Sequence, residues 1–265
     1  MTKKSAIQVE KVNTQIVKWL KTYAENAKVN GFVIGISGGV DSAVTSTLCA
    51  QTGLKVLCVE MPIHQAPSHV IRGREHIEEL KQRFPNVSSI EADLTGVFET
   101  FKKAVSEDSD TAKVHLALAN TRARLRMTTL YYFAGIHGLL VAGTGNKVED
   151  FGVGFYTKYG DGGVDLSPIA DLMKSEVYLL GRYLQIPESI LKASPTDGLF
   201  GDDRTDEDQL GASYDELEWA MLENEAGKSA EDFSGREKIV FEIYKRLNNI
   251  NQHKMLAIPV CFITK

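Results

Sequence analysis

The sequence predicts an α/β fold: an open, doubly wound parallel sheet with helices on both of its faces. Two observations lead to this prediction. Short apolar runs alternate with longer segments of helical composition between residues 31 and 144, a pattern typical of parallel sheets covered on both sides. A glycine-rich turn directly follows the first apolar run, and in such sheets ligands bind beyond the carboxyl ends of the strands.

Each element is predicted from its local pattern. Apolar residues recur at three- and four-residue steps from Ser5 to Lys28, which indicates an amphipathic opening helix. The run "GFVIGIS" predicts the first strand, and the helix after it ends near Gly53, a residue suited to a helix C-terminus. Helices are expected over residues 5–28, 40–53, 68–84, 95–105 and 114–136, and strands over residues 31–37, 55–63, 87–93 and 138–144.

The second half of the chain is less regular. Residues 146–168 are rich in glycine and too long for a simple connection, which indicates a functional loop. Residues 174–186 and 235–250 have helical composition, whereas residues 187–218 mix prolines, glycines and acidic side chains. The chain has no internal repeat and no linker that would divide it, so residues 1–265 are expected to form a single domain.

Composition restricts the class of protein. A net charge of −5 argues against a broad nucleic-acid or membrane-binding surface. The three cysteines are widely spaced in apolar sequence, which suggests neither disulfides nor a zinc site and fits a reducing cytoplasm. The N-terminus has no apolar signal region, and no stretch is long and apolar enough to cross a membrane.

The stretch "GISGGVDSA", Gly35 to Ala43, carries the clearest chemical signal. Its glycines allow the backbone N–H groups to approach an anion, and the helix that follows presents its positive end to the same place. The stretch matches neither the phosphate loop that contains a lysine nor the dinucleotide-binding pattern. The alternative is a glycine turn that only precedes a capped helix.

After a strand, "SGGVDS" resembles the pyrophosphate loop of the ATP pyrophosphatases, the adenine nucleotide α-hydrolase-like group. The segments "GTGNKVED", "FYTKYGDGGVDLSPIADLMKSEV", "SPTDGL", "TDEDQLGASYDELE" and "QHKM" follow in the order found in ammonia-dependent NAD synthetases. The resemblance covers nearly the whole chain. It implies a Rossmann-like fold of the adenine nucleotide α-hydrolase type and a ligase that forms a C–N bond.

By this resemblance, the enzyme adenylates the nicotinate carboxylate of deamido-NAD with ATP, releases pyrophosphate, and lets ammonia displace AMP to give NAD. The absence of a loop lysine is then understandable, because the loop would hold departing pyrophosphate instead of serving γ-phosphoryl transfer. Two alternatives remain: an RNA-modifying enzyme with the same loop, and a nucleotide-binding protein without catalysis. The acidic chain without a C-x-x-C motif disfavours the first, and the paired carboxylates disfavour the second.

The resemblance assigns residues to ATP and to magnesium. Asp41 lies within the phosphate loop and Glu149 follows the fourth predicted strand; each matches a magnesium ligand of the family, and hard cations prefer such carboxylates. Together with Lys174, these are the expected catalytic residues. The alternatives are a favourable first-turn aspartate and a turn in which Asn146 caps a helix. The expected ATP-binding residues are Gly35, Ile36, Ser37, Gly38, Gly39, Val40, Asp41, Ser42, Thr144, Lys174 and Thr196.

A second set matches family positions that contact deamido-NAD: Arg124, Lys158, Asp165, His253 and Lys254. Arg122 and Arg126 share a predicted helix with Arg124, but two-residue steps turn them by about 200° and prevent all three from facing one ligand. They are expected to be solvated or paired. The segment from Glu149 to Lys158 is one residue longer than in the shorter form of the motif, so the path of this loop stays open.

Two further expectations come from the family. Its glutamine-using members carry an added amidase domain, for which 265 residues leave no room, so free ammonia is the expected nitrogen donor. Members are typically homodimers, and the first helix and the helix that ends near Ile136 are candidate contact surfaces.

Overall fold

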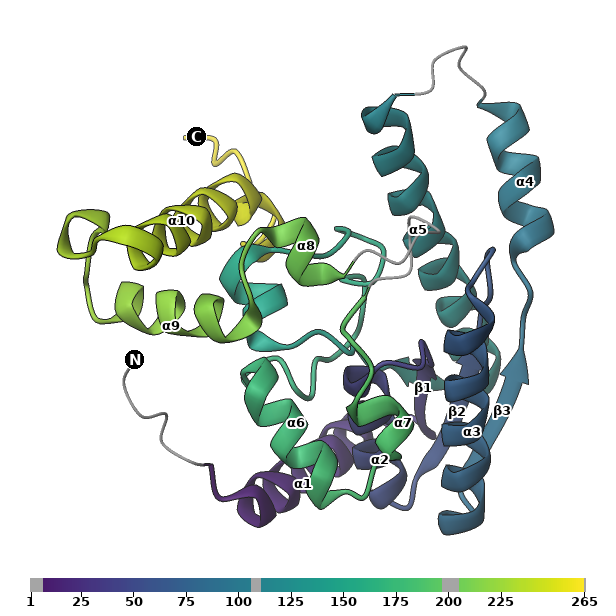
Figure 1. Ribbon diagram of the computed structural model, residues 1–265. Coiled ribbons are helices and arrows are strands. Elements are labelled where there is room, and N and C mark those ends of the chain that lie inside the picture. The colour runs from purple at the N-terminus through teal and green to yellow at the C-terminus, as the bar shows by residue number, and fades with distance from the viewer. Residues whose placement is uncertain (1–6, 106–110, 197–204, 265) are drawn as a thin grey trace.

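The computed structural model describes residues 7–105, 111–196 and 205–264. Within them, four parallel strands form one sheet in the order β3-β2-β1-β4 (Figure 1). The strands are β1 (Gly31–Gly35), β2 (Lys55–Glu60), β3 (Val87–Glu91) and β4 (Leu139–Val141). All four lie where they were predicted, although each is shorter than expected, because its apolar run continues into turns at the carboxyl edge of the sheet.

Helices connect and surround the strands. The α-helices are α1 (Val9–Ala27), α2 (Val40–Gln51), α3 (Pro67–Arg83), α4 (Thr95–Ala104), α5 (Ala112–His137), α6 (Lys174–Tyr183), α7 (Glu188–Leu191), α8 (Asp206–Leu210), α9 (Tyr214–Glu225) and α10 (Gly235–Met255). A π-helix, η1 (Val148–Val153), and a 3₁₀-helix, η2 (Ala230–Asp232), complete the described elements.

Both faces of the sheet are covered, which confirms the doubly wound α/β fold. Alternate residues of β1 point to opposite sides: Phe32 and Ile34 pack among side chains of α1, α2, α3 and α6, whereas Val33 packs with Ala134 of α5. Figure 1 shows α5 and α1–α2 on opposite sides of the strands. Burial of apolar side chains on two faces explains why the strands have continuous apolar sequence.

Strand β1 has a neighbouring strand on each side in the sheet. Strands β2 and β3 follow on one side of β1, and β4 returns to its other side. In a doubly wound sheet this reversal of strand order opens a crevice beyond the carboxyl ends of the two central strands. The turn after β1 and the segment after β4 therefore lie at the place where such folds bind ligands.

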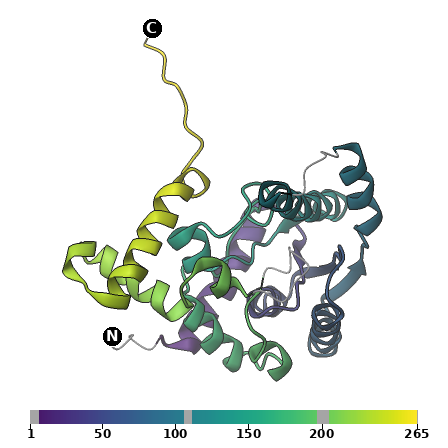
Figure 2. The same cartoon turned by 45° about the horizontal axis from the view of Figure 1, so that its top comes forward.

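A second apolar cluster forms beside the sheet. It contains Leu217 and Met221 of α9, Phe241 and Tyr244 of α10, and Val153 of η1. In Figures 1 and 2, α9 and α10 lie together to one side of the strands, and the last residues extend away from α10. The single domain expected over residues 1–265 stays a prediction, since the two clusters do not decide whether these parts unfold together.

Five of the described helical elements were not predicted: η1, α7, α8, α9 and η2. For α8 and α9 the signal was present, because Thr205 with Asp208 and Ser213 with Glu216 each form a capping box. The expected start of the first helix at residues 5 and 6, the acidic connection over residues 106–110, and residues 197–204 lie outside the described residues. Helix α10 extends five residues beyond its expected end at residue 250.

Among the residues that the structure describes, no helix is both long enough and apolar enough to cross a membrane.

Candidate active site

A cavity of about 280 Å³ lies beyond the carboxyl ends of β1 and β4. The residues expected to bind ATP converge on it: Gly35 through Ser42, Thr144, Lys174 and Thr196 all line this cavity. They come from the turn between β1 and α2, the segment after β4, the start of α6 and the segment after α7. The structure thus brings together, in one place, residues up to 161 positions apart in the chain.

Gly38 gives the turn between β1 and α2 its shape. Its φ of +80° is in the left-handed region, and a Cβ atom there would lie 2.5 Å from the backbone oxygen of His69. The turn is also tied internally, because Ser42 donates its hydroxyl to the Gly39 carbonyl at 2.9 Å and accepts from the Ser37 N–H at 3.3 Å. The serine hydroxyls, expected as donors to a ligand, here hold the loop in its conformation.

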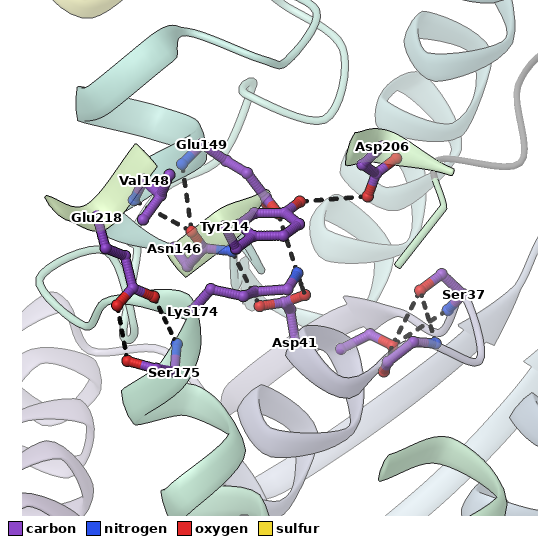
Figure 3. A network of polar contacts seen from close by, with 12 residues as sticks. Ser37, Asp41, Asn146, Val148, Glu149, Lys174, Ser175, Asp206, Tyr214 and Glu218 are labelled. Carbon is purple, nitrogen blue, oxygen red and sulfur yellow. Dashed lines mark hydrogen bonds and ion pairs between the residues drawn. The ribbon is translucent and has the colours of Figure 1, made fainter. Parts of the chain in front are cut away.

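A buried ammonium joins the two carboxylates that were predicted as magnesium ligands. The Lys174 Nζ atom donates to Asp41 Oδ2 at 2.6 Å and to Glu149 Oε1 at 3.0 Å (Figure 3). Lys174 is only 3% exposed. Asp41 is on the first turn of α2, Glu149 is in η1 and Lys174 is the first residue of α6. Three separate elements therefore meet at this cluster.

Burial and mutual attraction set the charges of the cluster. Burial raises the pKa of Asp41, although Lys174 opposes this. Burial acts in the same direction on Glu149, but the Lys174 ammonium and the Tyr214 hydroxyl outweigh it and lower the pKa of that carboxyl. For Lys174, the two carboxylates outweigh burial and raise the pKa, so the amine stays protonated.

Two neighbours orient these carboxylates. The Asn146 amide donates to Asp41 Oδ1 at 3.1 Å, and its oxygen accepts from the N–H groups of Val148 at 3.1 Å and Glu149 at 3.2 Å. Asn146 thus holds the turn that carries Glu149, which is the alternative role that the sequence offered for it. The Tyr214 hydroxyl lies 2.5 Å from Glu149 Oε1, and the Lys174 Nζ atom lies 4.7 Å from the centre of the Tyr214 ring.

The two carboxylates of this cluster are the type of ligand that magnesium prefers. Asp41 and Glu149 converge on the Lys174 ammonium, and their two negative charges exceed its single positive charge. In the described parts of the chain, no group of three or more His, Cys, Asp or Glu side chains is arranged to hold a metal alone. Two carboxylates are sufficient for magnesium when substrate phosphates and water supply the other ligands.

The cavity is also lined by four acidic residues that the sequence analysis did not single out: Glu60, Asp150, Asp161 and Asp206. Burial, together with the charges of Glu149, Asp161 and Asp41, raises the pKa of Asp150 to about 8. Burial also raises the pKa of Asp161, against the N–H of Thr157, which donates to its carboxylate at 3.0 Å. Asp150 and Asp161 thus place two further carboxyl groups next to the Asp41–Glu149–Lys174 cluster, and their raised pKa values favour the protonated, uncharged forms.

The predicted deamido-NAD residues form a second group. Arg124 donates to the backbone oxygen of Lys158 at 3.3 Å, and the Lys158 ammonium donates to the backbone oxygen of His253. Lys254 donates at 2.8 Å to the oxygens of both Gly154 and Tyr156. The end of α10 therefore holds the loop over residues 154–158, and none of these side chains is among the described residues that line the cavity.

Asp165 differs from the other four residues of that set. Its carboxylate accepts from the Tyr131 hydroxyl at 3.0 Å and from the Val141 N–H at 2.8 Å. These bonds attach the residues after the glycine-rich loop to α5 and β4. They provide a structural reason for an aspartate at this position, independent of any ligand.

The three arginines of α5 contact different parts of the protein, as their spacing predicted, but Arg126 lines the cavity. The Arg122 guanidinium lies 4.3 Å from the centre of the Phe98 ring. Arg126 lines the cavity and donates to the Met61 carbonyl at 3.1 Å and to Gln65 Oε1 at 2.7 Å. It was expected to be solvated or paired; it is paired, and it also faces the space in which a nucleotide would bind.

Comparison with known proteins identifies the family of the chain. The family model described as NAD synthase matches residues 12–257. The chain belongs to the NAD synthase family. The resemblance stated from the motifs is thereby confirmed, and it extends over the sheet, the cavity and both apolar clusters.

Relatives within the NAD synthase family cover almost all of the chain. The NH(3)-dependent NAD(+) synthetase of Carboxydothermus hydrogenoformans is 36% identical over 92% of this chain and 94% of its own length. That of Methanocaldococcus jannaschii is 34% identical over 95% of this chain and 96% of its own. Among solved structures, the NMN synthetase of Francisella tularensis has a TM-score of 0.83 and 31% identity, covering 97% of this chain and 100% of its own.

Sequence reasoning missed several residues of this NAD synthase site: Asn146 as a partner of Asp41, Tyr214, Asp150, Asp161 and Arg126. Tyr214 lies in "ASYDELE", whose capping box predicts a helix start next to the tyrosine. Asp161 lies in the glycine-rich "YGDGG", where a buried acid had no local signal. Asp150, Asp161 and Arg126 line the cavity, whereas Asn146 and Tyr214 contact Asp41 and Glu149; contacts of this kind between distant elements are not revealed by spacing within one element.

Proposed function

We propose that this chain amidates deamido-NAD to NAD, with ammonia as the nitrogen donor and ATP as the co-substrate. The carboxylate of the nicotinate group is first adenylated with release of pyrophosphate, and ammonia then displaces AMP. The enzyme is a ligase that forms a C–N bond. Membership of the NAD synthase family supports this reaction, and the RNA-modifying and non-catalytic alternatives have no support in the site.

One observation carries the proposal. The phosphate loop without a lysine and the pair Asp41 and Glu149 face the same cavity, with Lys174 between the two carboxylates. A loop of backbone N–H groups at the start of α2 is suited to the β- and γ-phosphates. The cluster lies next to it, where the α-phosphate of a nucleotide bound to the loop would lie.

In this arrangement the protein positions two substrates and neutralises charge. The substrate carboxylate itself is the nucleophile, so no side chain has to form a covalent bond. Lys174 stays protonated and holds Asp41 and Glu149 in place. Magnesium bound by Asp41 and Glu149 would supply positive charge to the phosphates. Thr144 and Thr196, on two sides of the cavity, are placed to donate hydroxyl groups to the nucleotide.

The nicotinate nucleotide would bind beside the loop over residues 154–165. The family resemblance assigns Arg124, Lys158, Asp165, His253 and Lys254 to it, and four of these meet on one side of that loop. Three of them are lysine or arginine residues, which are suited to the phosphates of a dinucleotide. Their cationic groups now donate to backbone oxygens, so binding of the substrate would replace these contacts with contacts to phosphate oxygens.

A direct assay tests the reaction. The purified protein is incubated with ATP, magnesium, deamido-NAD and either ammonium or glutamine, and AMP, pyrophosphate and NAD are measured. We expect the three products in equal amounts with ammonium and none with glutamine. Activity with glutamine alone would overturn the nitrogen donor, and ATP binding without AMP formation would favour a non-catalytic protein.

A mononucleotide substrate is a second candidate. The solved relative from Francisella tularensis, which matches this chain along its whole length, is described as an NMN synthetase. The same chemistry on nicotinate mononucleotide would use the same loop and carboxylates. The assay therefore runs with nicotinate mononucleotide in parallel, and the ratio of the two kcat/KM values decides between the substrates.

We further propose a cytoplasmic homodimer. Cys49 and Cys58 are buried free thiols and Cys261 is an exposed one, a state that a reducing compartment maintains. Helix α5 leaves Tyr132 and Ile136, four residues apart, 63% and 58% exposed. An apolar strip of this kind on a helix is typical of a protein contact.

A further inference from the structure

The phosphate loop has little positive charge of its own. Between Gly35 and Ser42 there is no lysine or arginine, and Asp41 adds a negative charge. The pyrophosphate that leaves from such a site carries several negative charges, and backbone N–H groups neutralise them only in part. A cation from another element is therefore needed close to the loop, on the side away from Asp41.

Helix α3 is the element that packs against the loop. A Cβ atom on Gly38 would lie 2.5 Å from the His69 oxygen and 3.2 Å from the Gly73 nitrogen, so the two backbones are in direct contact. Between these residues, Arg72 extends its side chain along the loop. Its Nε atom lies 3.4 Å from the Gly38 oxygen, and the residue lines the cavity while being only partly exposed.

The other cations around the cavity have strong partners. Lys174 is held by Asp41 and Glu149, and Arg126 by Gln65 and the Met61 carbonyl. Arg72, by contrast, forms no ion pair with any residue in the described parts of the chain, and its one hydrogen bond, to a loop carbonyl, is long. The next arginine on α3, Arg74, is paired with Glu60 and Glu91.

We propose that Arg72 binds the β- and γ-phosphates of ATP and stabilises the departing pyrophosphate. This role rests on the proposed function. When the substrate carboxylate oxygen bonds to the α-phosphorus, the bond from that phosphorus to the bridging oxygen breaks, and the electron pair leaves with pyrophosphate. The Arg72 guanidinium meets that growing charge with N–H donors, and no proton transfer is required. It supplies, from a neighbouring helix, the positive charge that a lysine supplies within other phosphate loops.

The test compares Arg72→Gln and Arg72→Lys with Lys81→Gln. Lys81 is on the same helix and loses the same charge, but it pairs with Glu78 on the surface. For Arg72→Gln we expect kcat/KM for ATP to fall roughly 10- to 100-fold, as for a lost hydrogen bond to a charged group. Inhibition by pyrophosphate should weaken by a similar factor. Lysine should restore part of both, and Lys81→Gln should match the wild type.

Binding of magnesium pyrophosphate, measured by calorimetry without turnover, separates this role from the overall function. Wild-type protein that binds pyrophosphate no more tightly than Arg72→Gln would overturn the role of Arg72, even if NAD is formed. Wild-type protein that makes no product but binds pyrophosphate through Arg72 would overturn the proposed function alone.

Rescue provides a second readout. Guanidinium ions at millimolar concentration should restore part of the activity of Arg72→Ala and leave Arg72→Gln unchanged, because only the smaller side chain leaves space for the ion. A purely structural role predicts a lower melting temperature and no rescue, and that result would contradict the proposal.

Discussion

Two partly buried carboxylates share one buried ammonium at the centre of the site. Without Lys174, Asp41 and Glu149 would repel each other in a place with little water, and their ionised forms would be strongly disfavoured. With Lys174, one net negative charge remains. This balance explains how both carboxylates can stay at the cavity wall while still attracting a divalent cation.

We predict that Asp41→Ala and Glu149→Ala fold but lose adenylation. Each substitution leaves Lys174 with one carboxylate, so the ammonium stays paired, while a proposed magnesium ligand is lost. Pyrophosphate release should fall on the order of 100-fold or more, in line with the loss of one preorganised charge. Glu188→Ala is the control, because that side chain pairs only with Lys192 on the surface. Release of pyrophosphate at the wild-type rate by both variants would refute the metal assignment.

At the scale of elements, the contact between the phosphate loop and α3 decides the shape of the cavity. The loop backbone passes so close to α3 that no side chain fits at Gly38. Helix α3 in turn packs against α2 through a buried hydrogen bond between His76 and Ser46. The loop therefore lies between α2, which follows it in the chain, and α3, which packs against it, and these two helices are bonded to each other.

The Gly38 contact leads to a prediction for Gly38→Ala. A methyl group would clash with the His69 oxygen, and alanine is strained at a φ of +80°. We expect the free energy of unfolding to fall by about 1–3 kcal/mol and the KM for ATP to rise. Gly96→Ala in α4 is the control, since nothing lies within 4 Å of its added methyl group. Equal stability and equal KM in the two variants would rule out the close contact.

His76 predicts how stability depends on pH. Its Nε2 atom lies 2.8 Å from the Ser46 oxygen, and burial, with a contribution from Arg83, lowers the pKa of His76 to about 4. The unfolded chain therefore binds a proton at higher pH than the native protein does. The contribution of a neutral His76 is complete above about pH 6.5, and about 3 kcal/mol is lost as the pH falls towards 4.

Chemical unfolding of the wild type and His76→Gln measures this effect. The glutamine can still bond to Ser46 but does not titrate, so the free energy of unfolding of the variant should change less between pH 6.5 and 4.5. Parallel pH profiles for the two proteins would show that His76 is not the titrating group.

At the scale of the whole molecule, the site joins two parts of the chain. Asp41 comes from the helix next to the sheet, whereas Tyr214 belongs to the apolar cluster of α9 and α10 and reaches Glu149 across the cavity wall. Lys174 begins α6, which contacts both parts. The position of α9 and α10 relative to the sheet thus controls the geometry of the Asp41–Glu149–Lys174 cluster.

The homodimer is tested at this scale. Replacing Ile136 by aspartate puts a charge into the proposed contact, so we expect monomers in light scattering where the wild type gives dimers. Ile239→Asp is the control, because Ile239 is similarly exposed, at 50%, but lies on α10. A wild type that is monomeric, or an Ile136→Asp dimer as stable as the wild type, would exclude this surface.

The phosphate loop, the two carboxylates and Lys174 could be named from the sequence because each lies in a segment that resembles a motif of the family, and all of them line the cavity. Strand positions were equally predictable, since burial on both faces leaves a continuous apolar run. The short helices α7 and α8 and the π-helix η1 were not, because four to six residues carry too little periodic signal. For α8 and α9, the capping boxes were a usable local signal of a helix start.

The sequence by itself determined the parallel α/β sheet, the order of its strands and helices along the chain, and the glycine turn after the first strand. The tertiary structure alone decided that Lys174 lies between Asp41 and Glu149, that Tyr214 contacts Glu149, and that Arg72 lies against the loop. The physical reason is the distance along the chain over which each effect acts. Hydrophobic periodicity and turn chemistry act over a few residues, whereas pairing of buried charges depends on how elements far apart in the chain pack together.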